Sequence, residues 1–532
     1  MDVFGLFNLP LWVIILVAVL ILFYRYQTKN FGVFKKMGVP FPSPWPMMGN
    51  ARVVFKKGFV EAYEEWFKTY GRVFGHFEGQ QPMLVVGDLD MLREITVKEF
   101  NSFTNRRDFG AAEIAEPPVT EFLTVLQDDD WRHNRNTLTP AFSGGKLKKM
   151  IGMIVEAGES FVAKLKTKAD NGEPVDIKGC TEAFTMDVIA ATAFGMKLDT
   201  QISPDDPFIK YARKFFDIKL NMAFIILFFF PFLTPLIKIF KLEISPKVSI
   251  EFFRNVVNQA LEERRKNPGK YSDFLQLMVN AKKEADSAAE NNDGSHSNGA
   301  VDEAGGDDTG GDDTHWKDKR KGKGLSDSEI LAASILFFIA GFDTTASTLA
   351  HLLYHLALNP DHMDKLIDEI DEHYPNGKAP DYETVGKLSY LDMVVQEGLR
   401  INPPFARMDR VCKRDVTIKG IHIPAGMTVA LPIYMIHHDP GYWTDPEVFD
   451  PERFTPENKE KHHPLQWIPF GYGPRNCIGM RLALFEMKVI IVQLLQRYRF
   501  VPNSKTKPLK FKDNPLLSNT KDGVWLTAEH RK

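Results

Sequence analysis

Cysteine is scarce in this chain, because its 532 residues include only three, Cys180, Cys412 and Cys477. A disulfide framework and the paired spacings of zinc sites both need more cysteines, placed closer together. So few cysteines favour a reducing compartment, and we therefore expect the folded bulk of the chain to face the cytosol. We interpret Cys180 and Cys412 as small, buried, apolar side chains.

Net charge is also small, at −3 for the whole chain at pH 7. A chain this close to neutral has no net excess of basic residues to attract nucleic acid, so we expect no nucleic-acid partner. What the chain does have is apolar content, with 44% hydrophobic residues over its length. A chain of this size and composition can bury a large core, and it exceeds the usual size of one domain.

The longest apolar run lies near the N-terminus, at residues 6–24. A helix of about 20 residues spans the hydrocarbon core of a bilayer. No basic residue precedes the run and no small-residue cleavage site closes it, which argues against a cleaved signal peptide. Arg25, Lys29 and Lys35 follow it, and the positive-inside rule then places the next domain in the cytosol. We predict a single-pass transmembrane anchor, residues 1–25, in the endoplasmic reticulum membrane.

Two proline-containing segments are predicted to lie close to this membrane. Prolines at 40, 42, 44 and 46 prevent a helix, so residues 26–50 should form a basic, proline-rich hinge before a folded domain at 51–532. A second apolar run, at 220–240, is broken by Pro231 and Pro235 into pieces too short to span a bilayer. We interpret it as a lid that dips into the membrane surface, and a buried core helix is the alternative.

Residues 282–324 have the opposite composition, acidic and rich in glycine, and contain the sequence GGDDT twice. The aspartates lack the spacing and the terminal glutamate of a calcium-binding loop. Low apolar content with high charge predicts a disordered surface insertion, to which we assign no chemistry.

The stretch FGYGPRNCIG, residues 470–479, carries the most specific chemical signal. Cys477 precedes an apolar helical repeat, so free backbone N–H groups and the positive end of the helix dipole favour its thiolate. Phe470 can shield the sulfur, and Arg475 offers a cation to a carboxylate. One soft anionic ligand beside a guanidinium suits a porphyrin iron, because zinc needs further ligands and covalent haem attachment needs Cys-x-x-Cys-His. The pattern Phe-x-x-Gly-x-Arg-x-Cys-x-Gly resembles the haem-binding signature of the cytochrome P-450 family.

This resemblance implies the cytochrome P-450 fold, which is mostly α with small β-sheets. It also implies haem b (iron protoporphyrin IX) as cofactor, with Cys477 as the axial ligand of the iron. The most similar subgroup is the microsomal drug- and steroid-oxidising one, with thromboxane synthase as a near relative. Residues 73–86 are expected to form a β-hairpin near the N-terminal edge of the domain.

Four further side chains are predicted to bind the haem propionates. Trp131 and Arg135 are four residues apart and therefore share one face of a helix, where an indole N–H beside a guanidinium suits a carboxylate. Their spacing resembles the propionate-binding Trp-x-x-x-Arg helix of the family. Arg106 and Arg410 resemble arginines with the same task in the drug-oxidising subgroup.

A capping box at 326–329 predicts a long helix over 330–358 that contains the sequence AGFDTT. Threonines inside a helix can bond the carbonyl four residues back, which fits a plain core helix but also loosens the backbone and could open a groove. The sequence resembles the oxygen-activation motif of the family. That resemblance makes Thr344 the proton-relay threonine and Asp343 the acid beside it, with Ala340 facing the haem.

Glu397 and Arg400 are three residues apart on one predicted helical face, a spacing that is common in surface ion pairs. Together with Arg453 in the downstream sequence PERF they resemble the structural triad that supports the haem-binding loop of the family. We expect these three residues to support the fold without touching substrate.

The predicted substrate pocket is apolar and therefore suits a lipophilic small molecule such as a steroid, a fatty acid or a xenobiotic. Its predicted lining residues are Phe109, Leu336, Ile339 and Phe405.

Little chain follows Cys477, so no flavin domain is expected after it and electrons should come from a separate protein. The resemblance implies NADPH–cytochrome reductase as donor, with cytochrome b5 as an additional candidate partner and O2 as co-substrate. Lys146, Lys148 and Lys149 are candidate contacts for an acidic partner, and a merely solvated basic turn is the alternative.

Three functions stay open at this point. The first is a monooxygenase that inserts one oxygen atom of O2 into its substrate. The second is an O2-independent haem-thiolate isomerase of fatty-acid endoperoxides, although thromboxane synthase lacks the threonine found here at 344. The third is a haem sensor without turnover.

Overall fold

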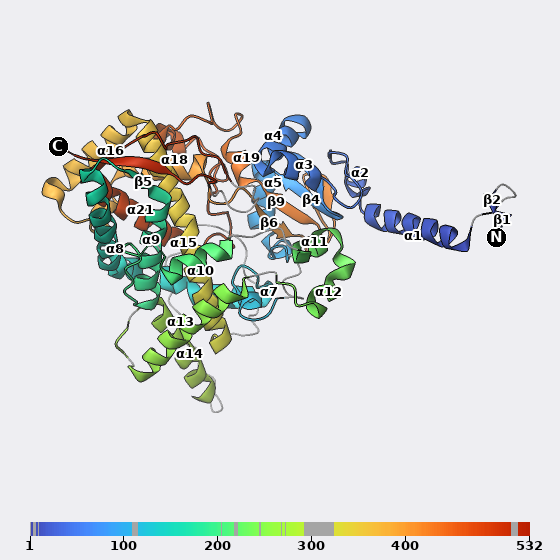
Figure 1. Ribbon diagram of the computed structural model, residues 1–532, viewed down its shortest axis with the longest axis horizontal. Coiled ribbons are helices and arrows are strands. Elements are labelled where there is room, and N and C mark those ends of the chain that lie inside the picture. Colours follow the sequence, from blue (N-terminus) through green and yellow to red (C-terminus); the bar gives the residue numbers. More distant parts are fainter. Residues whose placement is uncertain are drawn as a thin grey trace.

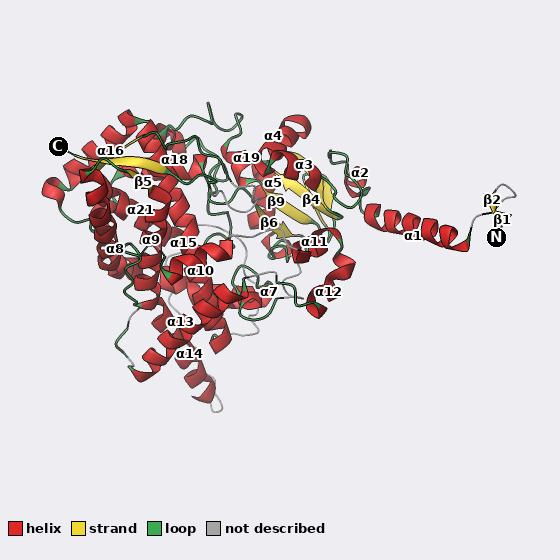
Figure 2. Cartoon of the chain, viewed as in Figure 1, coloured by secondary structure: helices red, strands yellow, loops and turns green. Residues whose placement is uncertain are grey.

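The computed structural model describes residues 2–3, 7–8, 10–108, 115–203, 205–216, 222–243, 246–267, 269–271, 273–291, 324–511 and 520–531. A large helical part and a smaller part built around a β-sheet lie side by side, and one helix projects away from the latter (Figures 1 and 2). The structure is mostly helical with small sheets, as predicted for this fold class.

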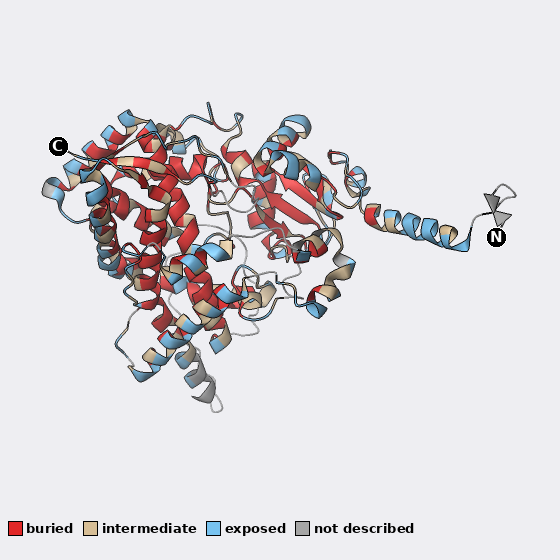
Figure 3. Cartoon of the chain, in the orientation of Figure 1, coloured by how far each residue is buried: buried red, intermediate tan, exposed pale blue. Residues whose placement is uncertain are grey.

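The projecting helix is α1 (Leu11–Thr28), and its apolar side chains face outward (Figure 3). Trp12 is 66% exposed and Leu20 is 55% exposed, because nothing in the protein packs on them. α1 is long and apolar enough to cross a bilayer, which makes it a candidate anchor. α15 (Asp327–Leu358) passes the same test but is mostly buried, as a core helix is. Two short strands, β1 (Asp2–Val3) and β2 (Phe7–Asn8), pair before α1.

The end of α1 is held by the folded domain. Gln27 is buried and accepts a 2.8 Å hydrogen bond from the amide of Gln80, and Asn30 donates to the Gln80 carbonyl at 3.1 Å. In α2 (Val33–Met37), Phe34 is fully buried against Gly75, where a Cβ would meet its ring at 2.4 Å. The start of the segment predicted as a hinge, residues 26–50, is therefore packed on the sheet. The apolar side chains of this segment, such as Phe34, explain the packing, and the proline pattern did not indicate it.

The main sheet has the order β3–β4–β9–β6. Its strands are β3 (Val73–Glu78), β4 (Gln81–Val86), β6 (Met408–Val411) and β9 (Thr428–Leu431). β3 and β4 form the predicted antiparallel hairpin, with Val73 opposite Val86, and β4 runs parallel to β9. Helices α3 (Ala51–Lys57), α4 (Phe59–Tyr70), α5 (Leu89–Arg93) and α19 (Ile433–His437) lie in the same part of the molecule (Figure 1).

The helical part is organised around α15 (Figure 3). Ser326 and Glu329 form the predicted capping box, and the helix ends before Asn359. α9 (Ile177–Phe194) lies along α15, and Thr181 and Thr185 donate hydrogen bonds of 2.9 Å to carbonyls of α15. α8 (Gly144–Asp170), α18 (Ser389–Ile401) and α21 (Met480–Leu495) complete the buried core.

The second apolar run is broken, as predicted, into α11 (Met222–Phe229), the short turn η5 (Pro231–Leu233) and α12 (Thr234–Ile239). Each helix is too short to span a bilayer. Phe232 and Phe240 are 48% and 67% exposed, and the Phe232 ring makes an edge contact with Tyr26 of α1 at 5.5 Å. Exposed apolar side chains of this run therefore lie beside the end of α1.

Residues 282–291 are the last turns of α14 (Phe274–Asn291), so the acidic insertion does not begin at 282 as predicted. The sequence AKKEADSAAE is rich in strong helix formers, and this outweighs its charge. Residues 292–323 lie outside the described residues.

The remaining helices and strands cover and connect these layers. They are α7 (Asp128–Leu138), α10 (Pro207–Phe216), α13 (Lys247–Lys266), α16 (Pro360–His373), α17 (Tyr382–Val385), α20 (Pro456–Lys459), β5 (Pro174–Asp176), β7 (Val416–Ile418), β8 (Ile421–Ile423), β10 (Tyr498–Val501) and β11 (Trp525–His530). Short helical turns are η1 (Glu94–Lys98), η2 (Phe100–Ser102), η3 (Val119–Glu121), η4 (Thr139–Phe142), η6 (Pro375–Gly377) and η7 (Pro451–Phe454).

Candidate active site

An internal cavity of about 490 Å³ lies between α15, the start of α21 and the loops that carry Arg106 and Phe405. Its walls are mainly apolar, with a few polar groups that converge on one region. This size and composition are typical of small-molecule and cofactor sites. The cavity brings together residues that are far apart in the sequence, among them Cys477 and Thr344.

Cys477 lines this cavity from the loop that precedes α21. Gly473 has a φ of +77°, and a Cβ there would lie 2.1 Å from the carbonyl oxygen of Thr96, so only glycine fits this turn. The backbone N–H of Cys477 donates to the carbonyl of Phe470 at 2.9 Å, which closes the loop under the sulfur. The side chain of Cys477 is exposed to the cavity.

The protonation of Cys477 is decided by opposing influences. Burial raises the pKa of its thiol, while backbone N–H groups of Gly479 and Met480 and the charges of Arg135 and Arg106 lower it. The start of the helix favours the thiolate as predicted, but on its own it does not outweigh the loss of hydration. A bound metal cation would favour the anionic form of this sulfur further.

Four buried or partly buried arginines gather beside Cys477. Arg475 donates to the carbonyls of Thr104 and Leu126 at 2.7 and 2.6 Å and lies over the Trp131 ring at 4.7 Å. Arg135, one helical turn after Trp131, donates twice to Asn476 at 2.9 Å.

The other two arginines are Arg106 and Arg410, and both have hydrogen-bond donors to spare. Arg106 lines the cavity, and Arg410 is fully buried next to it. Their Nε atoms, and Nη2 of Arg410, have no hydrogen-bond partner in the part of the chain that the structure describes. Burial and the neighbouring cations lower the pKa of Arg410 and of Arg475.

This excess of buried cations indicates an anionic ligand, since buried charges are normally paired. Asp409 and Asp128 are the carboxylates that act on the cluster, and they do not balance four guanidinium groups. A flat ligand with two carboxylates would supply the missing charge, and a thiolate on the same cavity would hold its metal. Haem b therefore fits the residues present.

Comparison with known proteins agrees with this chemistry. A family model described as cytochrome P-450 matches residues 39–303 and 311–527. The chain belongs to the cytochrome P-450 family. Cytochrome P-450 3A11 of Mus musculus is 41% identical over 526 residues, which cover 98% of this chain and 97% of that protein. Cytochrome P-450 3A7 of Homo sapiens is 40% identical over 535 residues, covering 100% and 99% respectively.

Membership of the cytochrome P-450 family makes this chain a haem-thiolate monooxygenase and confirms the predicted fold, enzyme class and haem b cofactor.

Thr344 and Ala340 line the P-450 cavity one helical turn apart on α15. The Thr344 hydroxyl donates to the Ala340 carbonyl at 2.7 Å, the backbonding that the sequence led us to expect. A Cβ on Gly341 would lie 2.4 Å from Ile189 of α9, so glycine permits close packing here. The hydroxyl of Thr344 is therefore held at the cavity wall.

Asp343 lies elsewhere. Its carboxylate is 2.8 Å from Nζ of Lys178 on α9, it is almost fully buried, and it is not part of the cavity lining. The role of Asp343 as the acid beside Thr344 therefore stays a prediction. Consecutive residues of a helix point about 100° apart, so Asp343 and Thr344 face different neighbours.

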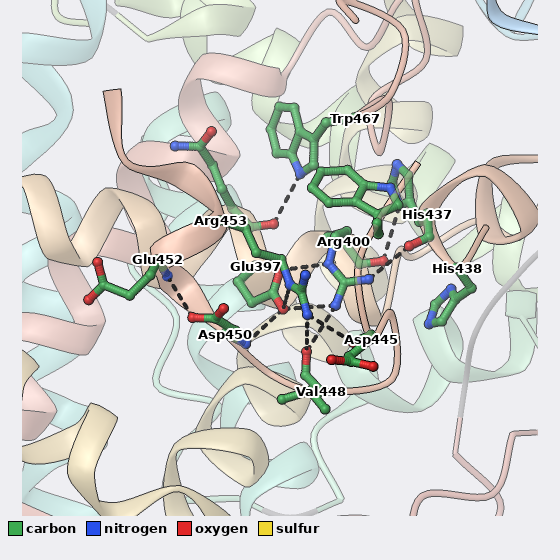
Figure 4. Close-up of polar contacts among 12 residues, drawn as sticks. Glu397, Arg400, His437, His438, Asp445, Val448, Asp450, Glu452, Arg453 and Trp467 are labelled. Atoms are coloured by element: carbon green, nitrogen blue, oxygen red, sulfur yellow. Dashed lines mark hydrogen bonds and ion pairs between the residues drawn. The ribbon is translucent and has the colours of Figure 1, made fainter. Parts of the chain in front are cut away.

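The predicted triad is formed by Glu397, Arg400 and Arg453 (Figure 4). Glu397 and Arg400 make two hydrogen bonds of 2.7 and 2.8 Å and are fully buried. Arg453 lies 3.4 Å from Glu397, and Arg400 also donates to the carbonyls of His437 and Val448. The triad ties α18 to the loop before α20 and stays out of the cavity.

Leu336, Ile339 and Phe405 line the cavity, where the sequence had predicted a substrate pocket. Phe109 lies outside the described residues. His437 and His438 make hydrogen bonds to backbone groups outside the cavity.

Sequence reasoning missed several residues of the cavity. The apolar ones include Phe215, Phe216 and Phe337. The polar ones include Thr345 and Glu486, and Glu486 lies on the buried face of α21. Its spacing could have revealed it, because Leu482, Glu486 and Val489 are three or four residues apart.

Proposed function

We propose that this monooxygenase inserts one oxygen atom of O2 into a lipophilic small molecule such as a steroid, a fatty acid or a xenobiotic. The observation that carries the proposal is the apolar wall formed by Leu336, Ile339 and Phe405 in the cavity that also holds Cys477 and Thr344. Burial of apolar substrate surface would supply most of the binding energy, at about 25 cal/mol per Å².

Haem b, when bound, supplies the reduction of O2 and the transfer of oxygen to the substrate. The residues of this chain position it. Cys477 would be the iron ligand, and Arg106, Arg135, Arg410 and Arg475 would hold the propionates. Trp131 supports this cluster through its contact with Arg475. Thr344 would pass protons at the cavity wall through its hydroxyl.

The exposed apolar segment of α11 and α12 supports substrate entry from a membrane. Phe232, Ile239 and Phe240 project from it beside α1, the candidate anchor. Such a surface would sit in the headgroup region of a bilayer. We propose that the chain is a single-pass protein of the endoplasmic reticulum membrane with its folded domain in the cytosol.

Electrons would come from NADPH through a separate reductase, with cytochrome b5 as a second candidate partner. The surface nearest Cys477 includes the start of α8 and of α21, where Lys149 and Arg481 are exposed. Lys148 is exposed too, but it is paired with Glu383 at 2.7 Å. These cations would attract an acidic partner and raise its association rate.

One experiment tests the function directly. Membranes containing the protein are incubated with NADPH–cytochrome reductase, NADPH and a panel of steroids, fatty acids and drug-like amines, and oxygenated products are measured. A parallel incubation replaces these reagents with a fatty-acid endoperoxide. Oxygenated product that depends on NADPH supports the proposal. Rearrangement of the endoperoxide without NADPH, and no oxygenated product, would favour an isomerase instead.

A further inference from the structure

Trp467 packs on Phe470, the aromatic residue at the start of the loop that carries Cys477. The two rings meet edge to face, with their centroids 6.3 Å apart and their planes at 67°. Phe470 lines the cavity together with Cys477, and its carbonyl accepts the backbone hydrogen bond of Cys477 at 2.9 Å. Because aromatic pairs prefer this geometry, the ring of Trp467 restricts the positions open to the ring of Phe470.

Trp467 is itself held in place by several contacts. Its indole N–H donates to the backbone carbonyl of Gln396 at 3.0 Å (Figure 4). The next residue, Ile468, donates its backbone N–H to Nε2 of His437 at 2.9 Å. The ring of Trp467 also meets Phe454 edge to face, with the centroids 6.1 Å apart. A side chain fixed in this way can hold a neighbouring ring in one position.

The contacts that fix Trp467 lead to the triad. Gln396 precedes Glu397 in α18, and Arg400 donates to the His437 carbonyl at 2.8 Å. Nδ1 of His437 lies 3.1 Å from the Arg400 carbonyl. Since Ile468 donates to Nε2, His437 is neutral and carries its proton on Nδ1, where it donates back to Arg400. The triad therefore fixes the backbone that precedes the sulfur-bearing loop.

The surroundings of an iron-bound sulfur affect the reduction potential of the iron. Hydrogen bonds from water to the sulfur withdraw charge from it, and solvent access stabilises the reduced state, which carries one more negative charge. Both effects raise the potential. An apolar ring kept beside the sulfur excludes water and therefore keeps the potential low.

We propose that Trp467 is a positioning residue that keeps the ring of Phe470 beside the sulfur of Cys477 and so holds the reduction potential of the bound haem low. Trp467 does not itself line the cavity, so it acts through Phe470. The inference rests on the ligation of the iron by Cys477, which is part of the proposed function.

The reduction potential of the haem-loaded protein, measured by spectroelectrochemical titration, tests this role. Trp467→Leu removes both the ring and the N–H, and we expect the potential to shift to more positive values because water then reaches the sulfur. The Fe–S stretching frequency in resonance Raman spectra should fall for the same reason. Trp467→Phe keeps an aromatic ring and should show a smaller shift in the same direction.

A double variant tests whether Trp467 acts through Phe470. Phe470→Leu should itself raise the potential, because it removes the shielding ring. Trp467→Leu/Phe470→Leu should raise it no further than Phe470→Leu does alone, since residues that act by one route give effects that do not add.

Trp443→Phe is the matched control. Trp443 is also buried, its indole N–H donates to the Ile436 carbonyl at 3.2 Å, and its ring contacts Phe454 at 5.7 Å instead of Phe470. Loss of this indole should lower the urea midpoint of unfolding, while the reduction potential and the Fe–S frequency stay at the wild-type values.

Distinct results would overturn the proposal. They are an unchanged potential in Trp467→Leu, an equal shift in Trp443→Phe, or additive shifts in the double variant. If Trp467→Leu does not retain haem, an unchanged potential and Fe–S frequency in Trp467→Phe would overturn it equally. Haem-loaded wild-type protein without the red-shifted carbon monoxide band would instead refute ligation by Cys477, and the role of Trp467 with it.

Discussion

Nζ of Lys178 lies 2.8 Å from the carboxylate of Asp343, and this contact joins the start of α9 to the middle of α15. Lys178 also donates to the hydroxyl of Ser347 at 2.6 Å. The side chains of Lys178 and Asp343 are 13% and 6% exposed, so the pair is shielded from water. The helix that forms one wall of the cavity is thereby held by an ion pair on its opposite side.

Lys178→Met is expected to lower the free energy of unfolding by about 3–5 kcal/mol, because it leaves Asp343 as an uncompensated buried charge. Urea unfolding followed by circular dichroism measures the change. The double variant Lys178→Met/Asp343→Leu should recover most of the loss. Lys166→Met removes an exposed ion pair to Asp170 on the surface of α8 and should lower the stability far less than Lys178→Met. Equal losses in both single variants would contradict this account.

Glu397→Ala should abolish stable haem binding. The substitution strands Arg400 in a fully buried position and costs about 3–5 kcal/mol. Haem content per polypeptide, measured after purification, checks this. Glu452→Ala lies on η7 next to Arg453 but removes only an exposed pair with Lys365, and it should keep full haem content. A normal haem spectrum in Glu397→Ala would show that the triad is not needed to hold the haem-binding loop.

Cys477→Ser should lose the spectroscopic signature of a thiolate ligand. The reduced wild-type protein with carbon monoxide should show the red-shifted absorption that thiolate-bound haem gives, and the serine variant should not. Cys180→Ser is the control, because Cys180 is buried on α9 and does not line the cavity. Retention of the red-shifted band in Cys477→Ser would exclude Cys477 as the ligand.

Thr344→Ala should separate electron consumption from product formation. The loss of the hydroxyl that lies 2.7 Å from the Ala340 carbonyl removes a proton-passing group from the cavity wall. We expect NADPH consumption to continue while H2O2 replaces much of the oxygenated product. Thr344→Ser keeps a hydroxyl and should keep most of the coupling. Equal coupling in the alanine variant and the wild type would rule out a relay at this position.

The stability of the protein should fall as pH rises toward 8, because of Glu486. Burial raises the pKa of Glu486 to about 8 in the folded state, from an ordinary value of 4.5. Between these values the folded state holds the extra proton, so the free energy of unfolding decreases with pH, by at most about 1.4 kcal/mol per pH unit. Glu486→Gln should remove this decrease. Urea midpoints measured from about pH 5 to about pH 9 test the prediction, and parallel curves for the variant and the wild type would contradict it.

Local sequence patterns were sufficient to predict the elements that depend only on residues close together in the sequence. The capping box at Ser326, the hairpin from Val73 to Val86 and the break at Pro231 depend on neighbouring residues, and the structure has all three. The loop before α21 was equally readable, because Gly473 and Cys477 are close in sequence.

Long-range partners could not be read in this way. The pairing of Asp343 with Lys178 joins residues 165 apart, and no local pattern announces it. The packing at the start of the predicted hinge could not be read for the same reason, since Phe34 contacts Gly75 only once the sheet has formed. Glu486 is intermediate: its place on the buried face of α21 was visible in the spacing, but its exposure to a cavity was not.

The buried hydrogen bond between Gln27 and Gln80 has a practical consequence for anyone shortening this protein to make it soluble. Removal of residues 1–30 would delete Gln27 and Asn30 as well as the apolar residues of α1. The side-chain amide of Gln80, in the turn between β3 and β4, would then lose its hydrogen-bond partner. A truncation that begins the chain a few residues earlier, within the last turns of α1, would keep the hydrogen bonds of Gln27 and Asn30 to that turn. We expect this shorter deletion to give the more stable soluble enzyme.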